Sequence, residues 1–165
     1  MRVYLPGTAG TLRALLDSGE VAPAPLTGFA VTPALREWYL DDDIEALEYA
    51  ALLEAARGSL RLLDEDPTAP RRRVVIAADV PDHAVAFHPD LDRAVVRVNQ
   101  TVPLRLVASV HVDGSEAEKD VRAAAEAVLD ADLGSTDAQF VVDGAEGHEL
   151  AWYATQEIGA LVELL

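Results

Sequence analysis

The side chains best suited to chemistry gather in the segment HELAWYATQEI, residues 148–158. Its opening pair is not a zinc-protease site, because the second histidine four positions further on is absent. The segment instead predicts a strand followed by a helix, and backbone N–H groups at a helix start can hold an anion. The alternative is structural, with Thr155 capping the helix and the tryptophan packed in the core. The candidate ligand-binding residues of this segment are His148, Glu149, Trp152, Tyr153, Gln156 and Glu157.

A second cluster of the same kind lies upstream and comprises Arg36, Glu37, Trp38 and Tyr39. Tryptophan and tyrosine join a large apolar surface to a polar tip, which suits both cores and recognition pockets. Packing of both Trp-Tyr pairs in the core is the interpretation that we favour. If the two pairs instead line one cavity, groups for acid–base chemistry are at hand. Those groups would be Glu37, Glu48, His148 and Glu157.

A third set of polar residues alternates along one predicted strand. Ser109, His111 and Asp113 fall on the same face of that strand. A catalytic triad would also need an exposed nucleophile elbow, and the sequence contains no GxSxG. We therefore assign no nucleophilic catalysis to this strand.

No metal or cofactor site is predicted. His83 and His88, with Asp82 and Asp90 beside them, match no standard metal-ligand spacing and indicate surface residues. Asp41–Asp43 oppose the positive end of a helix dipole. As metal ligands they would converge poorly, because consecutive helical positions point about 100° apart. The early segment PGTAG lacks the lysine of a phosphate loop.

The charge balance excludes some partners. The chain has 29 acidic and 13 basic residues and a net charge of −16, whereas nucleic-acid binding relies on a basic surface. Arg71–Arg73 is a local exception, and we interpret it as a solvated loop entering a strand. We expect no nucleic-acid partner, and the partner could be a protein or a small molecule. Self-association into a homo-oligomer is a further option.

Length and composition predict one globular domain, residues 1–165. A chain of this size buries roughly 70% of its unfolded surface, so it needs no covalent cross-links. There are no cysteines, which excludes disulfides and thiolate chemistry. The N-terminus has no apolar stretch typical of a secretory signal, and no run is long enough to span a bilayer. We expect a cytoplasmic protein without a membrane partner.

The candidate clusters are positioned by elements that the pattern predicts. A long helix over residues 43–64 carries apolar residues in two stripes, which indicates burial on more than one side. Thr32-Pro33 starts a short helix before it, and Gly58 indicates a close approach within it. Other helices are predicted over 8–18, from a Ser115–Glu118 capping box to 131, and after Thr155. Residues 136–147 are undecided, with a preference for helix capped by Ser135 or Thr136.

Strands are predicted at residues 2–5, 26–31, 74–78, 94–98, 106–113 and 150–154. The run from Val74 to Ala78 is continuously apolar, which indicates a central strand covered on both faces. Together these elements predict an α+β fold. It would be a two-layer domain in which helices pack on a mixed sheet of about five to six strands.

Five segments read together carry a resemblance: GFAVTPALREWY, EALEYAALLEAARGSLRLL, RRRVVIAADVP, VASVHVD and HELAWYATQEI. The chain resembles a family of small uncharacterised actinobacterial proteins, a domain of unknown function. The resemblance covers nearly the whole chain and implies a bacterial, cytoplasmic origin. The bias toward arginine, with 12 of the 13 basic residues, agrees with a GC-rich genome. The resemblance implies no activity, cofactor or catalytic residue for this chain.

Two hypotheses on function follow. The first is a non-enzymatic binding or regulatory protein with an acidic surface. The second is a small-molecule enzyme or ligand sensor whose pocket lies between the Trp38-Tyr39 and Trp152-Tyr153 segments.

Overall fold

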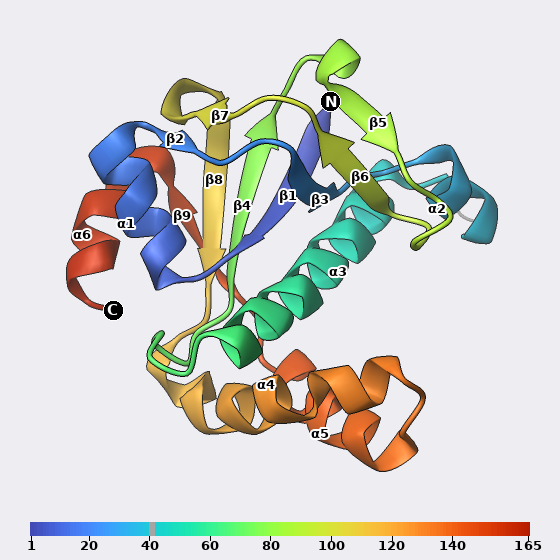
Figure 1. Cartoon of the computed structure of the whole chain (residues 1–165), viewed down its shortest axis with the longest axis vertical. Coiled ribbons are helices and arrows are strands. Elements are labelled where there is room, and N and C mark those ends of the chain that lie inside the picture. Colours follow the sequence, from blue (N-terminus) through green and yellow to red (C-terminus); the bar gives the residue numbers. More distant parts are fainter. Residues whose placement is uncertain (40–41) are drawn as a thin grey trace.

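The computed structural model describes residues 1–39 and 42–165, in which nine strands form two antiparallel sheets (Figure 1). The larger sheet has seven strands in the order β5-β6-β3-β1-β4-β8-β9, and β2 pairs with β7 in the smaller one. The strands are β1 (Arg2–Gly7), β2 (Glu20–Val21), β3 (Leu26–Phe29), β4 (Val74–Asp79), β5 (Val85–Phe87), β6 (Val95–Val98), β7 (Val102–Pro103), β8 (Val107–Val112) and β9 (Ala151–Ala154).

The helices agree closely with the predicted ranges. Gly19 ends the first helix in the left-handed conformation at φ 80°, and Thr32 caps the second with its side chain. The undecided segment, residues 136–147, forms a helix. Ser135 caps it, because its side chain accepts a hydrogen bond from the Ala138 N–H. The helices are α1 (Ala9–Ser18), α2 (Pro33–Trp38), α3 (Ile44–Glu65), α4 (Glu118–Asp132), α5 (Thr136–Glu146) and α6 (Ile158–Glu163).

Helices cover both faces of the larger sheet. In β4, Val74 and Ile76 join a core with α1 and α6, whereas Val75 and Ala77 join a second core with α3. The predicted central strand is thus confirmed. The α+β fold class is confirmed, whereas the expected two layers and the mixed sheet of five to six strands are not: the larger sheet has seven strands. Helices form two outer layers, and each strand pairing in the described chain is antiparallel. A buried apolar run does not encode strand direction.

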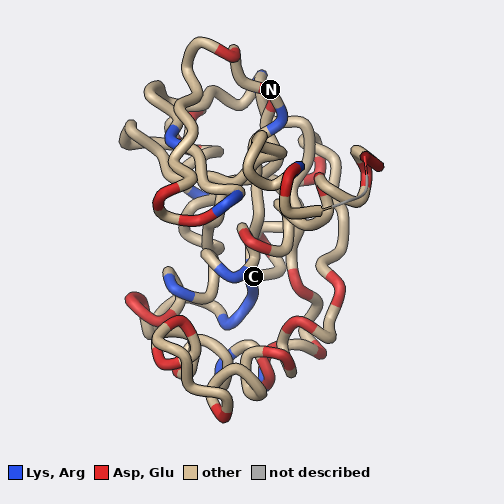
Figure 2. Tube along the Cα trace, turned by 90° about the vertical axis from the view of Figure 1, so that its right-hand side faces the viewer, with Lys and Arg blue, Asp and Glu red and all other residues tan. Residues whose placement is uncertain are grey.

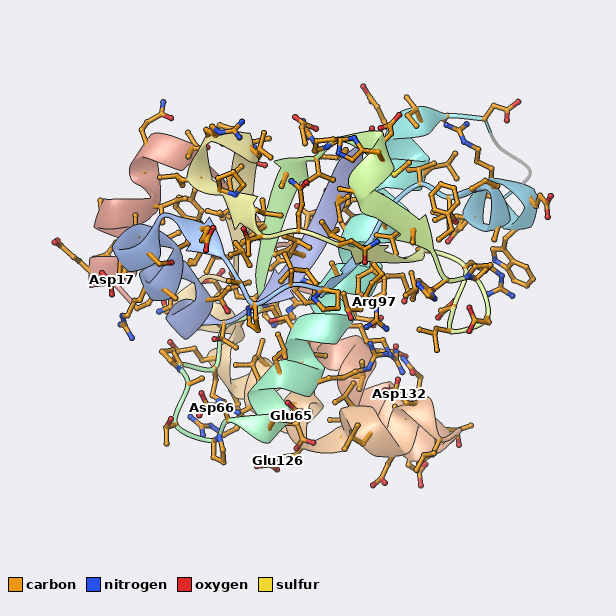
Figure 3. All side chains as sticks on the ribbon, turned by 45° about the horizontal axis from the view of Figure 1, so that its top comes forward. Asp17, Glu65, Asp66, Arg97, Glu126 and Asp132 are labelled. Carbon is orange, nitrogen blue, oxygen red and sulfur yellow. The ribbon has the colours of Figure 1, made fainter. Side chains whose placement is uncertain are left out.

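The long helix α3 packs on two partners, as its two apolar stripes predict. Leu47, Ala51 and Ala55 face the sheet, and Leu60 and Leu63 pack against α4 and α5. These two helices form a hairpin below the sheet in Figure 1. Asp132 of α4, labelled in Figure 3, forms ion pairs with two arginines of α3, Arg57 at 3.0 Å and Arg61 at 2.7 Å. Asp41, the first of the three consecutive aspartates that precede α3, lies outside the described residues.

The three consecutive arginines do not form a solvated loop, which corrects the expectation from sequence. Arg71 is buried and donates to three backbone carbonyls at the end of α3. Arg72 Nε lies 2.9 Å from a carboxylate oxygen of Glu118. Arg73 is only 1% exposed. Each guanidinium therefore has a specific structural partner, which the identity of its sequence neighbours could not reveal.

Arg73 and Asp113 form a buried ion pair between the start of β4 and the end of β8. Arg73 Nε and Nη2 donate to the two carboxylate oxygens at 2.8 Å each, and the Arg73 backbone N–H donates at 2.9 Å. The remaining Nη2 contact is the His148 carbonyl, at 2.9 Å. Both carboxylate oxygens of Asp113 and the Nε and Nη2 groups of Arg73 thus have hydrogen-bond partners, and such pairing is what allows a charge to be buried.

Two predicted helix caps are replaced by other contacts. A 3-10 turn, η3 (Ser115–Ala117), precedes α4 where a Ser115–Glu118 capping box was expected. The Thr155 hydroxyl lies in a second turn, η4 (Thr155–Glu157), and donates to the Val107 carbonyl at 3.0 Å. That hydrogen bond fastens the end of β9 to β8 and takes the place of a helix cap.

None of the described helices has the length and apolarity needed to cross a bilayer. Asp and Glu outnumber Lys and Arg along the trace, as Figure 2 shows.

Removing one partner of the buried ion pair is expected to destabilise the fold strongly. Asp113→Ala leaves the Arg73 guanidinium buried without its counter-charge. We expect the free energy of unfolding in urea to fall by about 3–5 kcal/mol. The control is Asp79→Ala, which breaks a partly exposed pair with Arg2 and is expected to cost at most about 1 kcal/mol. Equal losses in the two variants would contradict an anchoring role for the buried pair.

Two glycines in helices should respond oppositely to alanine. A Cβ at Gly58 would lie 3.1 Å from Pro6 and 3.3 Å from the Phe29 ring, whereas a Cβ at Gly144 meets nothing within 4 Å. Gly144→Ala is expected to raise the free energy of unfolding by roughly 0.5–1 kcal/mol through helix propensity. Gly58→Ala is expected to lower it, because Pro6 and Phe29 sit in the packed interface. A higher unfolding temperature in both variants would show that Gly58 is not tightly packed against Pro6 and Phe29, which would contradict the prediction.

Candidate functional site

The two Trp-Tyr pairs lie near opposite edges of the larger sheet. Trp38 ends α2, which is tied beside β6 by the bond from Thr32 to the Arg93 carbonyl. Trp152 lies in β9, the edge strand at the other end of the sheet order. Strands β3, β1, β4 and β8 separate β6 from β9 (Figure 1). The hypothesis of one pocket between the pairs is therefore wrong.

Core packing of the two tryptophans is also wrong. Their residue exposures are 60% for Trp38 and 61% for Trp152. The Arg93 guanidinium lies 3.5 Å from the centre of a Trp38 ring, in a cation–π contact. Arg36, Glu37 and Tyr39 are exposed around it. The upstream cluster therefore lies on the surface, and Arg93 covers one face of its Trp38 ring.

An open groove lies between α3 and strands β8 and β9, here called the α3–β9 groove. It arises because α3 packs on β1, β3 and β4 and leaves the same face of β8 and β9 uncovered. Its two hollows, of ≈ 300 and ≈ 240 Å³, share Tyr49, Leu52 and His111. The first is also lined by Arg2, Tyr4, Glu45, Glu48, Ser109 and Trp152. The second is also lined by Leu53, His148, Glu149 and Leu150.

The floor of the groove is set by strand register. Val75, His111 and Trp152 are cross-strand partners in β4, β8 and β9, and such partners share a face. Val75 lies in the core beneath α3. His111 and Trp152 therefore continue that row into the uncovered part of the sheet. Tyr153 points to the opposite face, where it packs on the α1–α6 core.

Polar contacts fix the side chains at the end of the groove near β1. The Tyr4 hydroxyl lies 3.4 Å from a carboxylate oxygen of Glu48. Burial, and next the negative charge of Glu48, raise the pKa of Tyr4 to about 12. Arg2 is held by Asp79 through contacts of 2.7 and 3.0 Å. Its charge is therefore already balanced within the protein.

The serine and histidine of β8 do meet in the groove. Ser109 Oγ lies 3.2 Å from His111 Nε2. Burial, with a smaller effect of the Arg2 charge, lowers the pKa of His111 below its ordinary value. Asp113 belongs to the buried pair with Arg73, so it is not an orienting partner for the imidazole. Ser109 is 4% exposed. The contact supplies a neutral, hydrogen-bonded wall and leaves the hydroxyl poorly accessible as a nucleophile.

The C-terminal candidates divide between the groove and other roles. His148 Nε2 contacts Asp120 of α4 at 2.8 Å, which fixes the lower end of the groove. Glu149 and Trp152 line the groove. Glu157 accepts the Ala154 N–H at 2.9 Å at the end of β9. Gln156 is exposed beside it.

Sequence reasoning missed the contributions of Arg2, Tyr4, Glu45 and Tyr49 to the groove. Tyr49 lies in the long helix that was predicted to be buried on more than one side, yet it is 52% exposed. The width of the apolar surface on this helix was the available signal, because a surface that wide can leave one margin uncovered and open to a ligand.

The described residues contain no cluster of three or more His, Asp or Glu side chains suited to a metal ion. The metal alternative for Asp41–Asp43 includes a position outside the described residues. Asp43 accepts the Glu45 N–H and caps α3. His88 Nδ1 lies 3.8 Å from Asp90 on the surface.

Neutralising Glu48 should lower the pKa of Tyr4. In Glu48→Gln we expect this pKa to fall from about 12, while burial keeps it above the ordinary value of about 10. Since the fold favours the neutral phenol, the stability it contributes is fully present below about pH 10. It is lost as pH rises through the folded value. Ultraviolet titration of tyrosinate measures this, with Tyr4→Phe assigning the step. An unchanged step in Glu48→Gln would refute the coupling.

The comparisons with known proteins give a family and no activity. No curated protein and no solved structure matches the chain. A family model, described as a family of unknown function (DUF6912), matches residues 1–162. That range is nearly the whole chain, so the protein belongs to this family.

Proposed function

We propose that the protein is a non-enzymatic binding or regulatory protein whose α3–β9 groove takes a ligand with a cationic group. The observation that carries the proposal is the contrast between two equally exposed tryptophans. Trp38 is covered by the guanidinium of Arg93. Among the described residues, no cation lies over Trp152, which stands in the groove. A cationic group of a ligand could form with the Trp152 ring the same cation–π contact that Arg93 forms with Trp38.

Charge in the groove supports the same ligand class. Glu45, Glu48 and Glu149 line it. None of the ion pairs between described residues includes these three carboxylates. A bound cation would therefore meet carboxylates that have no ion-pair partner among the described residues, in a protein whose net charge is −16. Tyr49 and Leu52 add apolar surface, which suits a ligand with an aliphatic or aromatic body.

Catalysis is the competing interpretation. It rests on the Ser109–His111 contact, whose hydroxyl is buried and whose imidazole is not paired with Asp113. Turnover of a metabolite that is lost in Ser109→Ala or His111→Ala would replace our proposal.

We also infer the setting of the protein from its sequence. The arginine bias and the resemblance support an actinobacterial, cytoplasmic protein, and its length supports a single domain. Its acidity favours a protein or small-molecule partner over nucleic acid or a membrane surface.

Agmatine, an aliphatic guanidinium amine, is the probe for this proposal. We expect it to shift the NMR signal of the Trp152 indole N–H saturably, with weaker binding at high salt. Isothermal titration calorimetry, which does not depend on the Trp152 signal, compares the variants: Trp152→Ala should weaken agmatine binding by about tenfold through loss of the cation–π contact. Trp38→Ala, at a tryptophan of equal exposure, should leave it unchanged. Hexanoate is the anionic control and should not bind.

Two results would refute the proposal. One is no saturable response to agmatine in the folded protein. The other is equal loss of binding in the two tryptophan variants, which would show that any exposed indole gives the same weak effect. Circular dichroism of both variants confirms that the fold is retained.

A further inference from the structure

The outer edge of β9 has backbone groups free for pairing. β9 is the last strand in the sheet order, so only β8 pairs with it. The Ala154 N–H donates to Glu157 at 2.9 Å, so it points away from β8. Backbone groups alternate in direction along an antiparallel strand. The N–H and C=O of Trp152, two residues earlier, therefore also point outward from the sheet.

We propose that the ligand is an extended basic segment of a partner protein, which adds to the sheet as a strand antiparallel to β9. This inference rests on the proposed function, because it uses Trp152 and the groove carboxylates as the binding surface. Strand addition supplies backbone hydrogen bonds for affinity, and side-chain contacts on alternate residues for specificity.

The register of such a strand fixes which side chains it should carry. The residue opposite Trp152 would exchange hydrogen bonds with it and place its side chain on the same face. That face holds the indole and, across the groove, Glu45 and Glu48. A lysine or arginine suits this position. The next residue faces the other side, where Tyr153 packs on the α1–α6 core, and an apolar side chain suits it. The expected pattern alternates basic and apolar residues.

Charge at the edge distinguishes a basic partner from a second copy of the chain. Glu149 and Glu157 lie on either side of β9, and both are exposed. In a two-fold pairing of β9 with itself that sets Trp152 opposite Ala154, Glu149 of one copy would stand opposite Glu157 of the other. Like charges directly opposite each other destabilise a ladder. A basic segment meets attraction at both ends of the same edge.

The test uses octapeptides of known sequence with the full-length protein. Acetyl-(Lys-Val)₄-amide is expected to bind more tightly than agmatine, and acetyl-(Glu-Val)₄-amide is expected not to bind. Binding is followed by the fluorescence of Trp152 in a Trp38→Phe background. Trp152→Phe with Trp38 retained provides the signal control. Phe87→Ala, at the opposite sheet edge, is the matched variant that should leave affinity unchanged.

Backbone methylation of the peptide tests strand addition without altering the protein. In the proposed register the lysine N–H groups face β9 and the valine N–H groups face solvent. N-methylation of two central lysines should weaken binding by about tenfold or more, through lost hydrogen bonds. N-methylation of two central valines should have little effect.

The outcomes separate this inference from the proposed function. If both methylated peptides bind like the parent, strand addition is refuted, while the cation site stands. If neither agmatine nor any peptide binds, both proposals fail. A concentration-dependent dimer in sedimentation that excludes the basic peptide would assign the β9 edge to a second copy and overturn the inference.

Discussion

The buried pair of Arg73 and Asp113 is the constraint on which the groove depends. Its two charges have little contact with solvent, and a buried charge is tolerated only with good geometry and full hydrogen bonding. Arg73 stands before β4, Asp113 follows β8, and the carbonyl of His148 precedes β9. One guanidinium thus joins three chain segments at one end of the sheet. Their relative positions place Trp152 beside His111 on the face that α3 leaves open.

The position of α3 decides which part of the sheet is core and which part is surface. The helix packs on the central strands, and its C-terminal half packs on α4 and α5. These two contacts fix its position over the central strands, so it does not cover β8 and β9, and its Tyr49 is left facing the groove. A row of side chains that begins in the core with Val75 therefore ends in the open groove with Trp152. The exposed aromatic surface follows from the size of the sheet relative to the helix that covers it.

The electrostatic character of the groove comes from where the arginines are used. Arg71–Arg73 hold helix ends and strand ends, Arg57 and Arg61 hold Asp132, and Arg2 holds Asp79. With 13 basic residues against 29 acidic ones in the chain, these contacts leave the surface strongly acidic. The contact between Arg93 and Trp38 shows the kind of interaction that an exposed indole accepts in this protein. Among the described residues, none forms such a cation–π contact with Trp152.

The sequence by itself determined the local elements. Apolar spacing predicted α3 within one residue at each end, the continuous run predicted β4, and Thr32 marked the start of α2. These features depend on neighbours within a few positions, so the pattern contains them. The tertiary structure alone decided strand direction, the burial of Arg73, and the separation of the two Trp-Tyr pairs. It also assembled the groove from Tyr4, Tyr49, His111 and Trp152. Those outcomes depend on which strands become neighbours, and that choice is made by the packing of the whole sheet against its helices, which no local pattern encodes.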